Sequence, residues 1–310
     1  MPARRFSQAL LAISLLGLAA CATPQTAAVI ADPGDLPSRA AAANVPFYPQ
    51  EDNYCGPSAL ATVLTWSGAP AQPDEVAAQV YTPERQGTLQ NDILTAARRA
   101  GRLAVPLGDL RDVMAEIAAD HPVIVFQNLG LSWYPQWHYA VAVGYDLEQH
   151  EIILRSGAEA ERVTELETFE RTWERGGHWA LVVLPPDRLP ASAEPEGVVR
   201  AAAGLERAGR GAEAAQAYAA TLVRWPDSFA ALMGLGNTRF ADGDVDGAER
   251  AFRQAIEVEP ERAEAWNNLA YVLAAKGLRE DARAAAQEAV RLSPDNEAPY
   301  LETLEEVSGG

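Results

Sequence analysis

The chain has 310 residues, of which 48% are hydrophobic and 22% are charged, and acidic side chains outnumber basic ones by 43 to 25. Its formal net charge of −18 would be repelled by the phosphate backbone of nucleic acids and by anionic lipid head groups. We therefore expect no nucleic-acid partner. Any membrane attachment should come from a covalent lipid rather than from a basic patch.

The first 20 residues have the pattern of a secretory signal, which is removed and takes no part in the fold. Arg4 and Arg5 precede an apolar run centred on residues 10–18, and two alanines then lead to Cys21. The sequence Leu-Ala-Ala-Cys that ends there resembles a bacterial lipobox, whose cysteine becomes the acylated N-terminus after cleavage. An ordinary signal peptide with a chance cysteine is the alternative.

Ala22, rather than an aspartate, follows Cys21. By resemblance to lipoproteins of Gram-negative bacteria, this favours an anchor in the outer membrane of the cell envelope, with the protein facing the periplasm. A multiply acylated cysteine is a stable anchor, whereas a single acyl chain binds only marginally. Residues 21–43, rich in Ala, Pro, Thr and Ser, are predicted to be the acylated cysteine and a flexible tether with a reach of roughly 70–80 Å.

The central stretch of the chain is residues 50–64, QEDNYCGPSALATVL, which contains Cys55. Apolar residues recur at i, i+3 and i+4 from Leu60, and Pro57 stands where its missing N–H does no harm, so a helix is predicted from about residue 58. Cys55 would lie at the N-terminus of this helix. The helix dipole stabilises a thiolate there, and the thiolate is the nucleophilic form of cysteine.

Gln50 and the small number of cysteines both favour a catalytic role for Cys55. With Cys21 used for the anchor, Cys55 has no partner for a disulfide in an oxidising compartment. Acyl-transfer chemistry needs hydrogen-bond donors at the developing oxyanion, and Gln50 can supply one together with the Cys55 N–H. The alternative for an isolated cysteine is a small buried hydrophobe. We prefer the nucleophile.

Residues 44–186 show helical patterns first and β-branched runs bounded by turn residues later, which predicts an α+β domain. The expected helices are 58–64 (ended by Gly68), Pro73–Tyr81, Leu89–Ala100 (capped by Thr88), Leu110–Ala119 and Glu165–Glu174, and the expected strands are Leu103–Leu107, Pro122–Phe126, His138–Tyr145, Glu151–Arg155 and Trp179–Leu184.

His138 is the second candidate catalytic residue. It opens an apolar strand, so its ring can extend from the sheet towards the helix that begins near Cys55. Its role would be to deprotonate the cysteine and later to protonate the leaving amine. A half-buried histidine at a strand end is the alternative. The other histidines, His121, His150 and His178, lie at a strand entry, in a turn and after two glycines, and have no such context.

Together, Gln50, the run CGPSAL at residues 55–60 and His138 resemble papain-like cysteine peptidases of the bacteriocin-leader-processing type, the thirty-ninth family of cysteine peptidases. The resemblance covers roughly residues 44–186, and it implies an α+β papain-like fold and hydrolysis of peptide bonds. Two features depart from the family. Tyr54 stands where many relatives have an acidic residue, and the spacing from glutamine to cysteine is one residue tighter than in the commonest form.

The third catalytic residue also departs from the family pattern. Asp146 lies roughly 26 Å from His138 along a straight strand, which is too far to orient the imidazole. In a hairpin that turns near Glu148, the residue opposite His138 lies close to Ser156 or Gly157. Relatives usually have an aspartate in that place, and Ser156 corresponds to it by position. A serine hydroxyl can accept a hydrogen bond from the ring but brings no charge. Asn128 is a second candidate.

Three aromatic residues, Trp133, Tyr134 and Trp137, occur just before His138. They could wall a substrate groove, or they could pack over the edge of the sheet. No metal site or cofactor is expected, because one unlipidated cysteine and four scattered histidines lack ligand spacing, and the chain has no Gly-rich phosphate loop.

Beyond a Pro-rich linker at residues 187–194, the chain repeats with a period of 34. A repeat of this length resembles the tetratricopeptide repeat, a pair of antiparallel helices. We expect an all-α solenoid over 195–310, with units at 195–228, 229–262 and 263–296 and a last, capping helix. The residues that recur are Gly209, Gly243 and Gly277, Ala214, Ala248 and Ala282, and Pro226, Pro260 and Pro294.

Two functions fit this sequence. The first is a lipid-anchored periplasmic cysteine peptidase that uses Cys55, His138 and Gln50, acts on a peptide or protein substrate, and holds a protein partner on its repeats. The second is a weak or inactive peptidase-like scaffold in an envelope assembly, which the serine at position 156 favours. Retention of all three polar residues in the expected order favours the enzyme.

Overall fold

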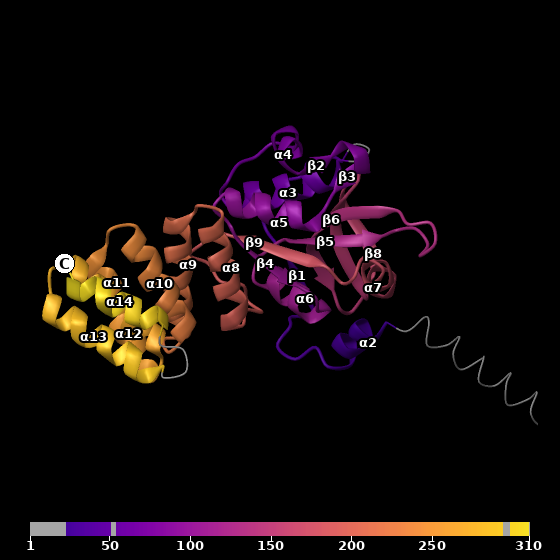
Figure 1. Cartoon of the computed structure of the whole chain (residues 1–310). Helices are drawn as coiled ribbons and strands as arrows, with labels where there is room; N and C mark the ends of the chain where they lie inside the picture. The colour runs from indigo at the N-terminus through magenta and orange to yellow at the C-terminus, as the bar shows by residue number, and fades with distance from the viewer. Residues whose placement is uncertain (1–22, 51–53, 294–297, 310) are drawn as a thin grey trace, which may run out of the picture. The chain divides into compact units, whose positions relative to one another are not determined.

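The computed structural model describes residues 23–50, 54–293 and 298–309. The predicted signal peptide and Cys21 lie outside these residues. The chain divides into two compact units (Figure 1). The first contains the residues up to Trp66, Pro70–Ile93 and Pro106–Val182, and the second contains Ser67–Ala69, Leu94–Val105 and the residues from Val183 onward.

A twisted, largely antiparallel sheet with strand order β4-β9-β5-β6-β7-β8 forms the centre of the first unit, and β1 also pairs with β6. At the middle of the sheet, Ile124 on β5 faces Val141 on β6 in an antiparallel register. The strands are β1 (Arg39–Ala41), β4 (Leu103–Leu107), β5 (Val123–Asn128), β6 (Trp137–Asp146), β7 (Glu151–Ser156), β8 (Glu159–Glu165) and β9 (Ala180–Leu184), and a small ribbon pairs β2 (Tyr81–Thr82) with β3 (Gly87–Thr88).

Helices cover both faces of this sheet, with α3 on one side and α6 and α7 on the other, and α2 packs on α6 and α7 (Figure 1). The central residues of β5 and β6, 123–126 and 139–143, are apolar because both faces of the sheet are covered there. Side chains from β5, β6, α6 and α7 form one core that includes Val125, Ala142 and Phe169. The helices are α2 (Pro24–Ala31), α3 (Cys55–Trp66), α4 (Pro73–Val80), α5 (Gln90–Arg99), α6 (Leu110–Ala118) and α7 (Leu166–Glu174).

The flexible tether expected over residues 21–43 is wrong for the part that the structure describes. Residues 24–31 form α2, whose Val29 is only 2% exposed. The buried Glu170 carboxylate of α7 accepts the N–H groups of Gln25 at 3.0 Å and Thr26 at 2.6 Å. Further along, β1 pairs with β6. An Ala-rich composition concealed these contacts, because they depend on partners more than 100 residues away.

Two other local expectations differ from the structure. Thr88 was expected to cap α5, but it belongs to β3, and its hydroxyl is buried without a hydrogen-bond partner in the described chain. The strand β8 was not expected, because only two of its seven residues are even partly buried and it lacks an apolar alternation. Both differences arise where tertiary pairing, rather than local preference, determines the conformation.

The second unit contains the predicted tetratricopeptide repeats as pairs of antiparallel helices. Even the first pair has a complete opening helix. Gly209, Gly243 and Gly277 have φ values of +73°, +83° and +78° at the turns between paired helices, which explains the period of the glycines. The helices are α8 (Pro195–Arg207), α9 (Gly211–Arg224), α10 (Phe229–Ala241), α11 (Val245–Val258), α12 (Ala263–Ala275), α13 (Arg279–Leu292) and α14 (Ala298–Gly309).

A search of the described residues finds no helix whose length and apolar character would let it cross a bilayer.

The contribution of the contact between Glu170 and α2 to the stability of the first unit can be tested by substitution. We expect Glu170→Ala to lower the free energy of unfolding by about 1–3 kcal/mol, because it leaves the N–H groups of Gln25 and Thr26 without their acceptor. Urea unfolding followed by tryptophan fluorescence measures this change. Glu174→Ala, an exposed carboxylate on the same helix, is the control. Equal changes in the free energy of unfolding for the two variants would mean that the hydrogen bonds from α2 to Glu170 contribute nothing to stability.

Candidate active site

The helix α3 positions Cys55 as its first residue. Its packed side is largely apolar, with Leu60 and Val63 at 0% exposure, and it packs against β6 and β5. Ser58 N–H donates to the Tyr54 carbonyl at 3.0 Å, which closes the first turn around the cysteine. Cys55 is a free, half-buried thiol. Packing of the helix against the sheet therefore fixes the position of the sulfur.

The thiolate expected from the helix dipole is not favoured. Burial raises the pKa of the Cys55 thiol above its ordinary value, and the backbone N–H groups of Tyr139 and Gly56 offset only part of that rise. Desolvation of the charged form thus outweighs the helix N-terminus. In the resting protein the thiol is neutral at neutral pH.

His138 is the second residue of β6, and Ser156 ends β7, the next strand of the sheet. The Nε2 atom of His138 lies 2.9 Å from the Ser156 hydroxyl. Burial lowers the pKa of His138 to about 4, and the positive charge of Arg162 adds to this effect. The imidazole is therefore neutral over most of the pH range, and no carboxylate is present in the described contacts to stabilise the imidazolium.

Asn128, the second candidate for orienting the imidazole, does not contact His138. Its Oδ1 accepts the N–H groups of Gly130 at 3.0 Å and Gln136 at 2.8 Å, so it shapes the loop between β5 and β6. Asp146 is at the far end of β6, where its carboxylate pairs with Arg39 at 2.6 Å. Of the residues considered from the sequence, Ser156 is the one that meets the imidazole.

Gln50 uses both ends of its side-chain amide. Its Oε1 accepts the Gly157 N–H at 2.8 Å and its Nε2 donates to the Tyr139 carbonyl at 3.2 Å, while its backbone N–H donates to the Gly157 carbonyl at 2.9 Å. These bonds join the segment after Ser156 to the strand that carries His138. This role in positioning was not predicted, because sequence spacing does not reveal which loops a side chain connects.

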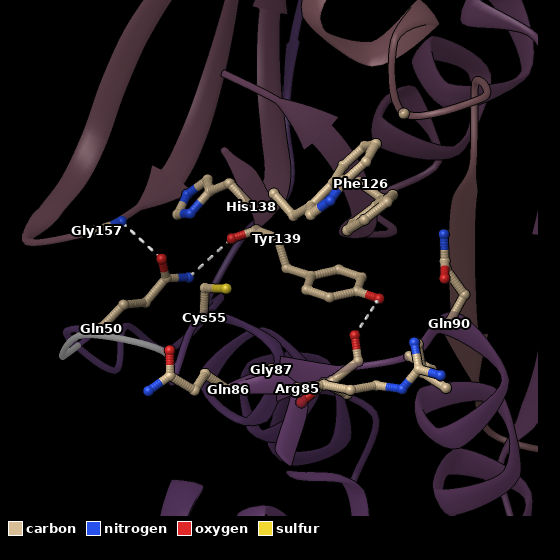
Figure 2. A pocket seen from close by; sticks show the side chains of 14 residues that line it. Gln50, Cys55, Arg85, Gln86, Gly87, Gln90, Phe126, His138, Tyr139 and Gly157 are labelled. Carbon is tan, nitrogen blue, oxygen red and sulfur yellow. Dashed lines mark hydrogen bonds between the residues drawn. The ribbon is translucent and has the colours of Figure 1, made fainter. Parts of the chain in front are cut away.

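A cleft of about 760 Å³ in the first unit is lined by Gln50, Cys55 and His138. Figure 2 shows Gln50, Cys55, His138 and Gly157 at one end and Arg85, Gln90 and Phe126 at the other. Between Cys55 and His138, both of them described, no hydrogen bond is present. The lining residues are Gln50, Cys55, Arg85, Gln86, Gly87, Thr88, Leu89, Gln90, Phe126, Trp137, His138, Tyr139, Gly157 and Gly176.

Tyr139 forms the floor of the cleft, and sequence reasoning missed it. Its hydroxyl donates to the Thr88 carbonyl at 3.1 Å and so connects the sheet to the loop that carries Arg85 (Figure 2). Burial, with a smaller contribution from Cys55, raises the pKa of Tyr139, so the phenol stays neutral. Arg85 is the single charged side chain among the described lining residues. The described lining of the cleft is therefore nearly neutral.

The remaining histidines lie away from the cleft. Nδ1 of His121 is 2.7 Å from the buried Glu116 carboxylate, Nδ1 of His150 is 3.4 Å from Glu167, and His178 packs edge-on against Trp173. Among the described residues there is no group of three His, Cys, Asp or Glu side chains that could hold a metal ion.

Comparisons with known proteins identify the two parts of the chain. Residues 42–181 match the model of the Peptidase_C39 like family, and residues 200–249 and 235–297 match a tetratricopeptide-repeat model. Residues 42–181 are therefore similar to the C39-like peptidase family, and the predicted fold classes, an α+β domain followed by tetratricopeptide repeats, are confirmed. No curated protein matches the chain.

Similar solved structures cover one part or the other. A Bacillus anthracis protein described as a C39-like peptidase has 19% identity and a TM-score of 0.42, and the match covers 47% of this chain and 97% of that one. For the peptidase domain of Streptococcus ComA, a bifunctional ABC transporter, the values are 22%, 0.37, 46% and 99%. For SycD, a type III secretion translocator chaperone of Yersinia enterocolitica, they are 19%, 0.35, 36% and 90%.

The neutral state of the thiol and imidazole can be tested by replacing Ser156. We expect Ser156→Asp to place a carboxylate at Nε2 of His138, to raise the pKa of the imidazole and, through the imidazolium, to lower the pKa of Cys55. Alkylation of Cys55 by iodoacetamide near pH 7 should then become roughly tenfold faster or more.

The matched control is Ser156→Asn, which has the same shape without the charge. In the parent protein, alkylation should rise only at alkaline pH, since the pKa of Cys55 is raised. Equal alkylation rates for the Asp and Asn variants would show that His138 and Cys55 do not form an electrostatic pair.

Proposed function

We propose that this chain, which combines a C39-like peptidase domain with tetratricopeptide repeats, is a cysteine peptidase that hydrolyses peptide bonds. The observation that carries the proposal is the convergence of Cys55, His138 and Gln50 at one end of a single cleft (Figure 2). Gln50 and Cys55 belong to one stretch of sequence, whereas His138 comes from a distant strand, and a purely structural role for each would not require that His138 meet the other two.

The protonation states of Cys55 and His138 before substrate binds determine the order of the proposed chemical steps. Because the thiol and the imidazole are both neutral, His138 would take the proton as the Cys55 sulfur attacks the peptide carbonyl, in the manner of a general base. When Nε2 carries the ring proton and donates a hydrogen bond to the Ser156 hydroxyl, Nδ1 is the ring atom that can accept the proton from Cys55. The same atom would then protonate the leaving amine, and water would hydrolyse the acyl-enzyme.

Gln50 and the Cys55 N–H would hold the oxyanion. The Gln50 amide nitrogen has two hydrogens, and the Tyr139 carbonyl uses one of them. The second hydrogen remains for the substrate. Since the acceptor end of the amide is fixed by the Gly157 N–H, the donor has one orientation before the substrate arrives, which is the preorganisation that oxyanion stabilisation needs.

A peptidase-like binding scaffold is the second candidate. Two observations favour it: Ser156 brings no charge to His138, and the described Cys55 and His138 side chains make no hydrogen bond to each other. Catalytic hydrogen bonds are often long in a structure without substrate, so the second observation carries less weight than the first. In either case the repeats are a protein-binding module, and we propose that they hold a protein partner.

Substitution at Gln50 separates the enzyme from the scaffold. With a mixed peptide library read by mass spectrometry, we expect cleavage to be abolished in Cys55→Ala and to fall about 10²–10³-fold in Gln50→Glu. The glutamate keeps the acceptor for Gly157 and loses both donors. Gln90→Glu, which places the same charge at the other end of the cleft, should retain most of the activity.

A parent protein that binds library peptides without cutting them, and binds them equally well as Cys55→Ala, would replace the peptidase with the scaffold.

We also propose that Cys21 is acylated and anchors the protein in the outer membrane, facing the periplasm. The sequence around Cys21 supports this proposal. The net charge of −18 also supports it, because a protein with this charge would need a lipid rather than a basic patch to attach to a membrane. In a Gram-negative host fed a labelled fatty acid, we expect label on the parent protein and none on Cys21→Ser, with the variant released from the membrane fraction. Label on the serine variant would contradict the proposal.

A further inference from the structure

The loop between β5 and β6 presents an uncovered aromatic surface. Its tip is a tight hairpin in which Leu131 and Tyr134 exchange backbone hydrogen bonds of 3.1 and 3.0 Å. Trp133 is 80% exposed, Tyr134 65% and Leu131 56%. We call residues 129–137 the aromatic hairpin. Packing over the edge of the sheet, one of the two roles expected for these aromatics, is therefore wrong for Trp133 and Tyr134.

The aromatic hairpin contains no charged residue, although 22% of the chain is charged. Every residue from 131 to 137 is exposed, and Trp133 and Tyr134 are not among the lining residues of the cleft. The tip is thus a projection rather than the wall of a groove. A partner that covers it must accept indole, phenol and leucine side chains without supplying countercharges. The interface of a lipid bilayer does this, and Trp and Tyr are enriched there.

The helix α7 connects the aromatic hairpin to the start of the described chain. Near the middle of α7, Glu170 accepts the Gln25 N–H at the first turn of α2. At its C-terminal end, the Arg175 guanidinium donates to the Asn128 carbonyl, at the base of the hairpin, with distances of 3.0 and 3.2 Å. Glu170 and Arg175 are five positions apart in the sequence, which corresponds to a rise of about 7.5 Å along a helix.

The predicted anchor lies close to α2 in the sequence. Only residues 22 and 23 separate Cys21 from Pro24, the first residue of α2. Because α2 is bound to α7, an acylated Cys21 would hold this region of the first unit against the bilayer instead of letting it swing on a long tether. The hairpin base lies in the same region.

We propose that the aromatic hairpin inserts Trp133, Tyr134 and Leu131 into the lipid interface next to the anchored Cys21. This inference rests on the lipid anchor of the proposed function for its location, but not on peptidase activity. Trp137, at the base of the hairpin, lines the cleft and stacks on Phe126, with ring centroids 5.2 Å apart. The end of the cleft at Phe126 would therefore face the membrane region, and the substrates of the cleft would be polypeptides at the membrane surface.

The attraction would be apolar, because a protein of net charge −18 gains nothing from anionic head groups. Binding should be insensitive to salt and weaker on anionic than on zwitterionic vesicles. It should also be weak by itself, since even one acyl chain binds only marginally. The hairpin would orient a protein that the lipid already holds.

Flotation with phosphatidylcholine vesicles tests the proposal. The protein is the chain from residue 21 with Cys21→Ser, which carries no acyl group. We expect it to float with the vesicles at millimolar lipid, equally in low and high salt. Trp133→Ser combined with Tyr134→Ser should reduce the bound fraction at least tenfold. The control is Val223→Ser, which removes an 86% exposed apolar side chain from the repeats and should change nothing.

Flotation of the double variant to the same extent as the parent would overturn the inference, and so would no flotation of the parent at millimolar lipid. If the double variant floated normally but cleaved library peptides poorly, the hairpin would be a substrate-binding surface instead. Absence of label on Cys21 together with normal hairpin-dependent flotation would refute the anchor and leave the hairpin contact standing.

Discussion

Three hydrogen bonds from Gln50 hold the candidate site together. They tie Gly157 and Tyr139 to the segment just before Cys55, so the ends of two neighbouring strands and the start of α3 are fixed relative to one another. The contact between Ser156 and His138 depends on this, because Ser156 precedes Gly157 and His138 precedes Tyr139. Gln50 thus connects the segments that carry Cys55, His138 and Ser156.

Burial determines the charge state of the same groups. It raises the pKa of Cys55 and lowers the pKa of His138, so both shifts favour the neutral pair over the ion pair. An aspartate in place of Ser156 would oppose the second shift. The raised pKa of Cys55 makes the resting sulfur less nucleophilic. It also makes the sulfur more resistant to oxidation, because oxidants react with the thiolate. In the periplasm, where we propose that this protein is anchored, that resistance has value for a cysteine without a disulfide partner.

The sequence predicted those features of the fold that depend on local pattern. The helix at Cys55, the strands β5, β6 and β9 and the repeat helices all follow from periodicity and turn residues, and the glycines with positive φ explain the period of 34. The contact of Ser156 with His138 followed from hairpin register. Features that depend on distant partners were missed. The Ala-rich segment before β1 resembles a tether until Glu170 is seen to bind it.

The charge states and polar contacts of the site also separate into features that local sequence predicts and features that depend on distant parts of the chain. Helix position alone suggested a thiolate at Cys55, but desolvation depends on how deeply the surrounding elements pack, which no local pattern reveals. Asn128 is also in a plausible position by sequence, at the end of a strand next to β6, yet its side chain is occupied by the backbone of its own loop. In both cases the residue type was right for the chemistry and the environment decided otherwise.

The most direct test of this account is ¹⁵N NMR of the His138 ring, assigned with His138→Gln. A neutral ring near pH 7, with the proton on Nε2 and conversion to imidazolium only near pH 4, is the predicted result, since Ser156 contacts Nε2 and burial lowers the pKa. A ring that is already imidazolium near pH 7 would contradict it. The site would then be a resting ion pair, and burial would not control its charge state.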